Sequence, residues 1–586
     1  MQKGNIVMYK IWRYYKAPYD HTPDMVCSQT IETARGDEIY TDEVLATLAE
    51  NGFNGIWLDG HLYDLVKHDV FPEFGEYAEL HIAALNRLIT KCASYNIKVF
   101  LCMQPGRGVS EHDKEFWQNH AEFAGSRYTM HTRSWGAKGD TEYTDLIGIC
   151  TAHEPVKRYI KEAFAELGKA LPGLGGCILL TGSEFQSHCA TFKVPEDKMC
   201  PVCAERDNAE IIAEVINLAV EGLHSTNKSA EIIAWDWGWT ADPMDVINKI
   251  SNEVILMPNF ESGITRDICG HKDITINEYS LGFAGPSPRM VQESEAADKR
   301  SMRWMARLQI GTTHEMGTVS NLPLLKNLFA KADFMRNHQS AGFMGCWNFG
   351  NMFSANTTAF NYFLSEEAPR DCREALKAFA GKYFENADVE KAAEAWELFS
   401  DTMCDNFPFD NTFMYAGPIP WAAGYFSPPG AMQGYGGLSF TTRMGNDRGD
   451  DILHAFKSYT IAELIPWMEK LADGAEKAAG LLQDALKNSH CRHAFEELSA
   501  IYTAACSYRS TANLMKIVQI KQTQGEAAAD NEEYLAIQRN ELNNVKKLLP
   551  FVEKDERQGF HPEARAYFFN IERLKNKIAK LEELLK

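Results

Sequence analysis

The sequence predicts an α/β protein: a (β/α)8 barrel of the TIM type, followed by a C-terminal α-helical domain. Over about the first 350 residues, short apolar runs rich in β-branched residues alternate with stretches of helical period. The alternation repeats about eight times, which is the number of units in such a barrel and fits its usual length. From about residue 359 the strand signal ends and helices continue. We therefore expect a barrel over residues 1–355 and a helical domain over residues 356–586.

Each predicted strand is a short apolar run that ends in polar or turn-forming residues. The strands cover residues 5–12, 55–59, 98–103, 177–181, 232–236, 254–257, 306–312 and 342–347. A doubly wound open sheet is the rival fold, but the sequence after the first run lacks the glycine-rich turn that such a fold would use. A further short run, residues 274–277, has no helical stretch before it, so we interpret it as part of a loop.

The helical half is interrupted by residues 405–450, which are rich in glycine, proline and aromatic side chains. A loop of this length inside a compact domain is commonly functional, and its aromatic residues favour packing toward the active site. The chain ends in heptad-like residues, FFNIERLKNKIAKLEELLK. These heptads could form a homo-oligomer, but a surface helix that packs on its own domain is the simpler interpretation.

Composition and charge exclude several classes of protein. The 586 residues are 45% hydrophobic and 24% charged, which is typical of a globular chain. The net charge of −21 would repel a phosphate backbone, so no nucleic-acid partner is expected. The sequence shows neither a signal peptide nor a long apolar segment, so no membrane partner is expected either. Its 14 cysteines lie mostly in isolation within apolar runs, which is typical of reduced thiols and predicts a cytoplasmic protein.

Polar and aromatic side chains follow nearly every predicted strand. The active sites of such barrels lie at the carboxyl ends of the strands, so these side chains should meet there. Any one of them could equally be a structural residue; the argument comes from their coincidence. The candidates for substrate binding are Arg13, Asp59, His61, Asp236, Trp237, Glu278, Tyr279 and Trp347.

Carboxylates combined with tryptophan and tyrosine are typical of a carbohydrate site, because the apolar faces of sugars stack on aromatic rings while their hydroxyls bind charged groups. Glycoside hydrolysis requires an acid beside the leaving oxygen and a second carboxylate across the anomeric carbon. Glu184, which follows the fourth strand, is the predicted acid. Glu315 is the first choice for the second carboxylate, with Glu278 and Asp236 as alternatives. A salt bridge with Arg289 or Arg13 is the structural alternative for Glu315.

A cluster of cysteines follows Glu184 in SHCATFKVPEDKMCPVCAERD. Cys200 and Cys203 could bind one metal ion, together with Cys189 and a fourth ligand such as His188 or Cys150. The predicted cofactor is a structural zinc ion, with none required for catalysis. Three reduced thiols in a loop are the alternative.

The segments ICTAHEPVKRYI, GCILLTGSE and AWDWGW resemble the catalytic barrels of β-N-acetylhexosaminidase-like exo-glycosidases, namely glycoside hydrolase family 20 and its relatives. There is a further likeness to bacterial α-glucuronidases, and together these likenesses span about residues 50–450. The resemblance implies that Glu184 is the general acid and that Trp347 lies under the sugar. The hexosaminidases carry an acidic residue just before this acid, where the present chain has Ser183.

Taken together, these features predict a glycoside hydrolase that acts on the end of a glycan or on a small glycoside, which could be a β-N-acetylhexosaminide. Two alternatives remain open at this stage. One is a non-catalytic carbohydrate-binding or scaffold protein on a decayed barrel, suggested by Ser183. The other is a zinc-dependent hydrolase, which would need an open coordination position on the metal.

Overall fold

The computed structural model describes residues 8–17, 31–131, 143–182, 186–191, 194–276, 280–348, 350–409, 413–414, 417–430, 459–562 and 566–586. Packing divides the chain into two compact units. The first, here called the barrel unit, comprises Met1–Phe260, Pro288–Leu308 and Ser340–Gly345. The second, the helical unit, comprises Glu261–Ser287, Gln309–Gln339 and Cys346–Lys586. The division of the chain at residue 355 stays a prediction, since two earlier segments pack with the helical unit.

The barrel unit is built on a parallel sheet whose strand order is β12-β9-β8-β7-β3-β2-β1-β14-β13. The strands are β1 (Tyr9–Trp12), β2 (Gly55–Asp59), β3 (Lys98–Met103), β7 (Gly176–Leu180), β8 (Glu231–Trp235), β9 (Ile255–Met257), β12 (Arg303–Trp304), β13 (Ala306–Arg307) and β14 (Gly342–Met344). The two outermost strands, β12 and β13, are separated only by Met305. β12 pairs with β9 and β13 pairs with β14, so one stretch of chain closes the sheet. The predicted eight-stranded barrel is thereby confirmed.

Burial explains why these strands form. All five residues of β2 and the last five of β3 are buried, as expected for strands that are covered on both faces. β2 and β3 have the predicted bounds. The seventh strand begins three residues earlier than predicted, with β12, and it ends at Arg307 of β13 although burial continues to Leu308 and Ile310, which are both fully buried.

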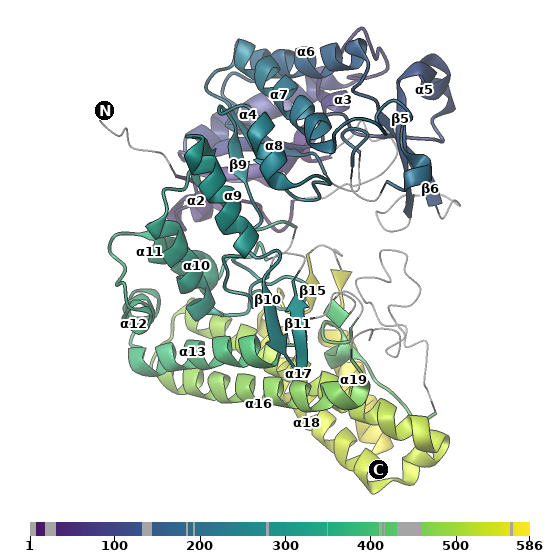
Figure 1. Ribbon diagram of the computed structural model, residues 1–586. Helices are drawn as coiled ribbons and strands as arrows, with labels where there is room; N and C mark the ends of the chain where they lie inside the picture. Colours follow the sequence, from purple (N-terminus) through teal and green to yellow (C-terminus); the bar gives the residue numbers. More distant parts are fainter. Residues whose placement is uncertain are drawn as a thin grey trace. The chain divides into compact units, whose positions relative to one another are not determined.

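Helices surround this sheet in the expected alternation. Those of the barrel unit are α1 (Ile31–Ile39), α2 (Asp42–Glu50), α3 (Leu62–Leu65), α4 (Ala78–Ala93), α5 (Lys114–Asn119), α6 (Glu154–Ala170), α7 (Asn208–Thr226), α8 (Pro243–Lys249) and α9 (Pro288–Lys299). Figure 1 shows α6 and α7 side by side. On α6, Val156, Tyr159, Ile160 and Ala163 are buried at the spacing of one helix face. Asp207 caps α7 by accepting a hydrogen bond from the backbone N–H of Ala209.

A small antiparallel sheet between β3 and α6 was not predicted. It contains β4 (Val109–Ser110), β5 (Ala124–His131) and β6 (Tyr143–Ile149), in the order β4-β6-β5. Leu146 and Ile147 of β6 are buried. The sheet is therefore an insertion that adds its own core at the carboxyl ends of the barrel strands, where β3 leaves the sheet.

The helical unit confirms the predicted change to α-structure. Its elements are β10 (Thr265–Ile268), β11 (His271–Thr275), α10 (Leu325–Asn337), α11 (Ala355–Leu364), α12 (Cys372–Tyr383), α13 (Val389–Asn406), α16 (Ile461–Ala485), α17 (Arg492–Gln524), α18 (Glu532–Lys554), β15 (Phe560–His561), β16 (Ala566–Tyr567) and α19 (Ile571–Leu584). The long helices pack in succession, α13 on α16, α16 on α17 and α17 on α18 (Figure 1). The run predicted as a loop, residues 274–277, begins within β11 of a surface hairpin.

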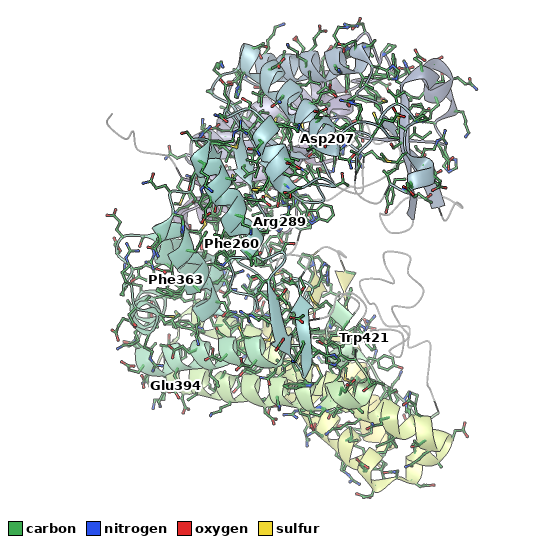
Figure 2. All side chains as sticks on the ribbon, viewed as in Figure 1. Asp207, Phe260, Arg289, Phe363, Glu394 and Trp421 are labelled. Carbon is green, nitrogen blue, oxygen red and sulfur yellow. The ribbon has the colours of Figure 1, made fainter. Side chains whose placement is uncertain are left out.

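Two predictions concern segments of the helical unit, namely residues 405–450 and the C-terminal heptads. Of the glycine- and proline-rich segment, the part over residues 417–430 packs on its own unit: Lys577 donates hydrogen bonds to the carbonyl oxygens of Ala422 and Ala423. Trp421 in this part is buried (Figure 2). The role of residues 405–450 beside the active site stays a prediction. The heptads form α19, which packs on α18 of the same chain, and a homo-oligomer also stays a prediction.

Candidate functional site

The carboxyl ends of β1 and β2 bring two predicted site residues into one buried cluster. Arg13 follows β1 and forms a two-pronged ion pair with Glu32 of α1, at 2.9 Å for both of its terminal nitrogens. The same carboxylate accepts a hydrogen bond of 2.8 Å from the backbone N–H of Asp59. The guanidinium of Arg13 also lies over the ring of Trp57, 4.1 Å from its centroid. Because Arg13, Glu32 and Asp59 are at most 2% exposed, their charges are held in place by one another.

His61 extends this cluster toward the end of β3. Its ring lies 3.9 Å from the carboxylate of Asp59 and within 2.9 Å of the guanidinium of Arg107. The ring stacks on Tyr63 with centroids 5.1 Å apart. Burial, and then the positive charge of Arg107, hold the pKa of His61 well below its usual value. His61 is therefore neutral near pH 7, so it can accept a hydrogen bond from a ligand or donate one.

Asp236, at the end of β8, belongs to a second charged cluster. Arg289 of α9 contacts the Asp236 carboxylate at 2.5 Å and that of Glu293 at 2.6 Å. Both carboxylates are fully buried, whereas the Arg289 side chain is 36% exposed; Figure 2 labels Arg289. The backbone N–H of Asn259, after β9, donates to Asp236 at 3.0 Å.

The guanidinium of Arg289 thus pairs with two buried carboxylates, those of Asp236 and Glu293. Burial raises the pKa of Asp236, and burial followed by the charge of Asp236 raises that of Glu293 well above its usual value. Two carboxylates that share a site in this way retain a proton to higher pH than a solvated acid does. Such paired acids are typical of catalytic sites, although structural ion pairs show similar shifts.

The connection that carries the predicted acid begins between two closely packed strand ends. Gly182 lies against Gly238, where a side-chain Cβ on either residue would come within 2.3 Å of the other's backbone. Gly238 also has a positive φ of 73°, which glycine adopts without strain. The indole N–H of Trp239 donates to the Thr181 hydroxyl at 2.9 Å. Trp237 lies in the same turn and is partly exposed.

Three predicted site residues lie outside the described residues: Glu184, Glu278 and Tyr279. Their neighbours are described on both sides. After the gap at Glu184, Gln186 donates to the Leu146 carbonyl at 2.8 Å, and Ser187 donates to that of Leu180 at 3.0 Å. The chain is therefore anchored two residues beyond Glu184.

Glu315 belongs to the helical unit and is fully buried. Its carboxylate accepts hydrogen bonds from the Ser280 hydroxyl, from the backbone N–H of Leu281 at 3.2 Å and of Gly282 at 2.9 Å, and from the Thr313 hydroxyl at 3.1 Å. These four neutral donors fix the turn at residues 280–282 to the chain around residue 315. Of the two arginines considered as its salt-bridge partners, Arg13 pairs with Glu32, and Arg289 pairs with Asp236 and Glu293.

Trp347 also lies in the helical unit, where it is 8% exposed. The side-chain amide of Asn351 donates to its carbonyl oxygen at 2.8 Å. Its predicted place beneath a sugar stays a prediction.

Sequence reasoning missed Glu32, Arg107 and Glu293. Glu32 lies on α1, away from the strand ends, so the strand-end rule could not find it. Arg107 lies in the loop after β3 and was within reach of that rule. Glu293 did leave a signal, because it falls at helical spacing on the buried face of α9 with Met290, Ser294 and Ala297. A charged residue on the apolar face of a helix indicates a buried partner of opposite charge.

The predicted metal ligands come together. Cys189, Cys200 and Cys203 lie with Cys150, and one sulfur from each is within 4.8 Å of all the others. Of the two fourth ligands considered, Cys150 is in this cluster. His188 instead accepts a hydrogen bond of 3.1 Å from the backbone N–H of Ala190 through Nδ1.

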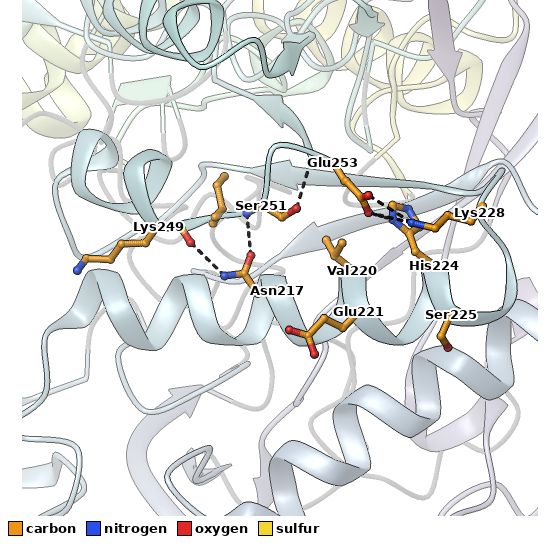
Figure 3. Close-up of a pocket in the computed structure, with 10 residues that line it drawn as sticks. Asn217, Val220, Glu221, His224, Ser225, Lys228, Lys249, Ser251 and Glu253 are labelled. Atoms are coloured by element: carbon orange, nitrogen blue, oxygen red, sulfur yellow. Dashed lines mark hydrogen bonds and ion pairs between the residues drawn. The ribbon is translucent and has the colours of Figure 1, made fainter.

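Figure 3 shows a surface pocket in the barrel unit, lined by residues of α7 and of the chain between α8 and β9. Its polar residues include Glu253, whose carboxylate contacts both His224 and Lys228. These residues precede β8 and β9, so the pocket lies at the amino ends of the strands. Barrel enzymes act at the opposite end, and this pocket is therefore no candidate active site.

No family model matches the chain, and no curated protein matches it. Several solved structures are similar. A glycoside hydrolase family 5 enzyme from Prevotella bryantii, in complex with a xyloglucan tetradecasaccharide, has a TM-score of 0.35 at 9% identity, covering 61% of this chain and 97% of the enzyme. A Bacteroidetes-affiliated family 5 cellulase has a TM-score of 0.38 at 11% identity, covering 63% and 95%. A β-mannanase from the blue mussel Mytilus edulis has a TM-score of 0.32 at 10% identity, covering 61% and 91%. The barrel itself is established by its own strand pairing.

In the part of the chain that the structure describes, no helix has the length and apolarity needed to cross a bilayer.

Proposed function

We propose that this protein is an exo-acting glycoside hydrolase whose active site lies at the carboxyl ends of the barrel strands. The observation that carries this proposal is the set of buried charged and titratable side chains after β1, β2 and β8. Arg13, Asp59, His61 and Asp236 are each at most 3% exposed. Burying so many charges opposes folding unless they pair, and barrel enzymes keep such groups at this end for catalysis.

These groups suit a polyhydroxylated substrate. Arginine and carboxylate side chains form paired hydrogen bonds with neighbouring hydroxyls, and the cluster holds both kinds in fixed positions. Trp237, partly exposed in the turn after β8, offers a ring on which a sugar face could stack. The substrate class is therefore a carbohydrate.

Glu184 is the proposed general acid, because it follows β7 and its connection is anchored on both sides. As the acid, it protonates the glycosidic oxygen as the bond to the anomeric carbon breaks. A general acid near neutral pH needs a raised pKa, which an apolar setting beside Leu180 and Phe185 would supply.

For the second carboxylate, the contacts favour Asp236 over Glu315. The oxygens of Glu315 already accept four hydrogen bonds from its own unit. Asp236 follows β8, which pairs with β7 so that Trp235 lies opposite Leu180. It is held by Arg289, a side chain that solvent and substrate can reach.

The resemblance of the sequence to the hexosaminidases is the support for a β-N-acetylhexosaminide as the substrate. In the family that the sequence resembles, an acidic residue orients the acetamido group, which then attacks the anomeric carbon. Ser183 lacks the charge for this role, and Asp236 on the neighbouring strand takes it instead. A zinc-dependent hydrolase is disfavoured, because four buried thiols would leave a bound ion no open position.

The test is hydrolysis of a panel of nitrophenyl glycosides by the wild type and by Glu184→Gln. We expect the variant to lose roughly 10²- to 10⁴-fold in kcat on the preferred glycoside, with unchanged thermal unfolding. Glu196→Gln is a matched control, since Glu196 lies exposed in the same connection. Unchanged turnover by Glu184→Gln would refute the assignment.

The same panel tests the finer proposals. Preference for the N-acetylglucosaminide over the glucoside, with inhibition by a thiazoline analogue of the sugar, supports the acetamido mechanism. Binding of sugars without turnover of any glycoside would favour the carbohydrate-binding alternative.

A further inference from the structure

Four cysteine sulfurs meet beside the connection between β7 and α7. They come from three separate stretches: Cys150 directly follows β6, Cys189 lies in the connection, and Cys200 and Cys203 form its Cys-Pro-Val-Cys turn. All four sulfurs lie within 4.8 Å of one another. The Sγ atom of Cys150 is 3.6 Å from that of Cys200 and 3.6 Å from that of Cys203.

These distances match a tetrahedron of thiolates around one metal ion. With zinc–sulfur bonds of about 2.3 Å, tetrahedral geometry places neighbouring sulfurs about 3.8 Å apart. The four cysteines are at most 3% exposed. Four soft sulfur ligands in a closed, buried site are typical of structural zinc.

The surrounding backbone is shaped to hold the four sulfurs. The backbone N–H of Cys200 donates to the Ser126 hydroxyl of β5 at 2.8 Å, and those of Cys203 and Ala204 donate to the Cys200 carbonyl at 3.0 and 2.9 Å. The last two bonds close the turn that brings Cys200 and Cys203 together. Opposite Cys189, a Cβ at Gly125 would lie 2.6 Å from the Cys189 sulfur. A larger residue at 125 would therefore displace this ligand.

Polar groups outside the sulfurs complete the arrangement. Arg206 contacts the sulfur of Cys203 at 3.9 Å and is itself held by Glu214 at 2.9 Å. A divalent ion with four thiolates carries a net charge of −2, which a neighbouring guanidinium partly offsets. Partners of this kind orient metal ligands and tune their basicity.

From this geometry we propose that Cys150, Cys189, Cys200 and Cys203 bind one zinc ion, which ties the β7–α7 connection to the small sheet of β4, β5 and β6. The ion binds Cys150, which directly follows β6, and three cysteines of the connection. Because a site of this kind does not exist in the unfolded chain, zinc binding stabilises the folded unit.

A consequence for catalysis rests on the proposed function. Cys189 follows Glu184 by five residues, and the segment between them is anchored at Gln186 and Ser187. Loss of zinc should release this anchor, so hydrolysis should fall while the residues that bind the sugar stay unchanged. The zinc ion acts by positioning the connection and does not touch the substrate.

The first test is metal analysis of the full-length protein, purified from zinc-supplemented cells without chelator. We expect one zinc ion per chain. A mercurial reagent that titrates thiols should release that zinc as four thiols react. Replacing zinc by cobalt in the wild-type protein should give the intense visible absorption of a tetrahedral thiolate site, and this readout does not depend on any variant folding.

Variants then test the ligands. Cys150→Ser and Cys203→Ser should each lose at least tenfold in zinc retained after dialysis. Cys92→Ser is the matched control, because Cys92 is a buried thiol of the same unit, on α4; it should retain one zinc ion. His188→Ala should also retain zinc if Cys150 is the fourth ligand.

Three results would overturn the proposal. They are a chain that binds less than a tenth of an equivalent of zinc with all its thiols reduced, a disulfide within the cluster, or iron in place of zinc. The proposed function is judged separately. One equivalent of zinc with no hydrolysis of any glycoside would overturn the function alone, and full hydrolysis by a zinc-free protein would overturn the positioning role alone.

Discussion

Two groups of buried carboxylates in this protein, Glu315 and the pair Asp236 and Glu293, are stabilised in different ways. In the helical unit, Glu315 accepts hydrogen bonds from four neutral donors, and it fixes the turn at residues 280–282. In the barrel unit, Asp236 and Glu293 share the single guanidinium of Arg289. The first carboxylate is stabilised as part of the structure, whereas in the second pair Glu293 has the more strongly raised pKa and Asp236 pairs with the guanidinium.

This contrast separates two kinds of buried acid that look alike in sequence. Each follows an apolar run and lies near polar residues. What differs is the number and charge of the donors, which determines whether the carboxylate is available to react. The contrast favours Asp236 over Glu315 as the partner of Glu184. Three measurements test this preference.

The largest effect is expected from Glu315→Ala. The change leaves up to four buried donors without an acceptor, so the free energy of unfolding should fall by about 3–5 kcal/mol. Denaturant unfolding measures this loss. Glu366→Ala, an exposed carboxylate of the same unit, should change stability by less than about 0.5 kcal/mol.

The opposite result would reverse the assignment. If Glu315→Gln keeps its stability but loses turnover, and azide restores turnover to Glu315→Ala, then Glu315 is the reacting carboxylate. The comparison with Asp236 would then fail.

A smaller effect is expected from Glu293→Gln, through the pH dependence of stability. The pKa of Glu293 is raised in the folded protein, mainly by burial. Between the unfolded pKa, near 4.3, and the raised folded value, the folded chain binds more protons than the unfolded chain. Stability should therefore fall as pH rises through this window, and each unit of elevation is worth about 1.4 kcal/mol.

In Glu293→Gln this contribution is removed, so the fall in stability with pH should be shallower than in the wild type. Unfolding followed at a series of pH values above 4 checks this expectation. Parallel curves for the two proteins would show that the pair does not share a proton.

The smallest effect is expected from Thr313→Val, which removes one hydroxyl donor from the Glu315 carboxylate. Three donors remain, so stability should fall by about 1–2 kcal/mol, well short of the loss in Glu315→Ala. A loss as large as that of the alanine variant would mean that the four bonds act as a single network and cannot be apportioned one by one.

Much of the barrel could be predicted because its strands are short, continuous apolar runs with polar ends. β2 and β3 were predicted at their observed bounds for this reason. The end of the seventh strand was misplaced because the chain stays buried beyond Arg307, where β13 ends. The hydrophobic pattern of a sequence predicts which residues are buried. It does not predict which buried residues pair with a neighbouring strand.

The candidate site was predictable where it follows the strands. Arg13, Asp59 and His61 were found by the strand-end rule, and they do lie together. Glu32 was missed because it lies on a helix and meets Arg13 only in the folded chain, whereas Arg107 was missed although it follows β3. Cys150 remained one of the choices for the fourth ligand, beside His188, because the sequence cannot show that β6 returns to the cysteine turn. The cytoplasmic location stays a prediction.

Closure of the barrel has a consequence for how the protein is made. β1 pairs with β14, which the ribosome produces only after all the other strands of the barrel sheet. Until β14 emerges, β1 presents an unpaired edge that other chains could join. A nascent chain must therefore keep its first strand from pairing wrongly for most of its synthesis. Slowing translation ahead of residue 342, or withholding chaperones, should therefore lower the yield of folded protein, even though the stability of the folded protein is unchanged.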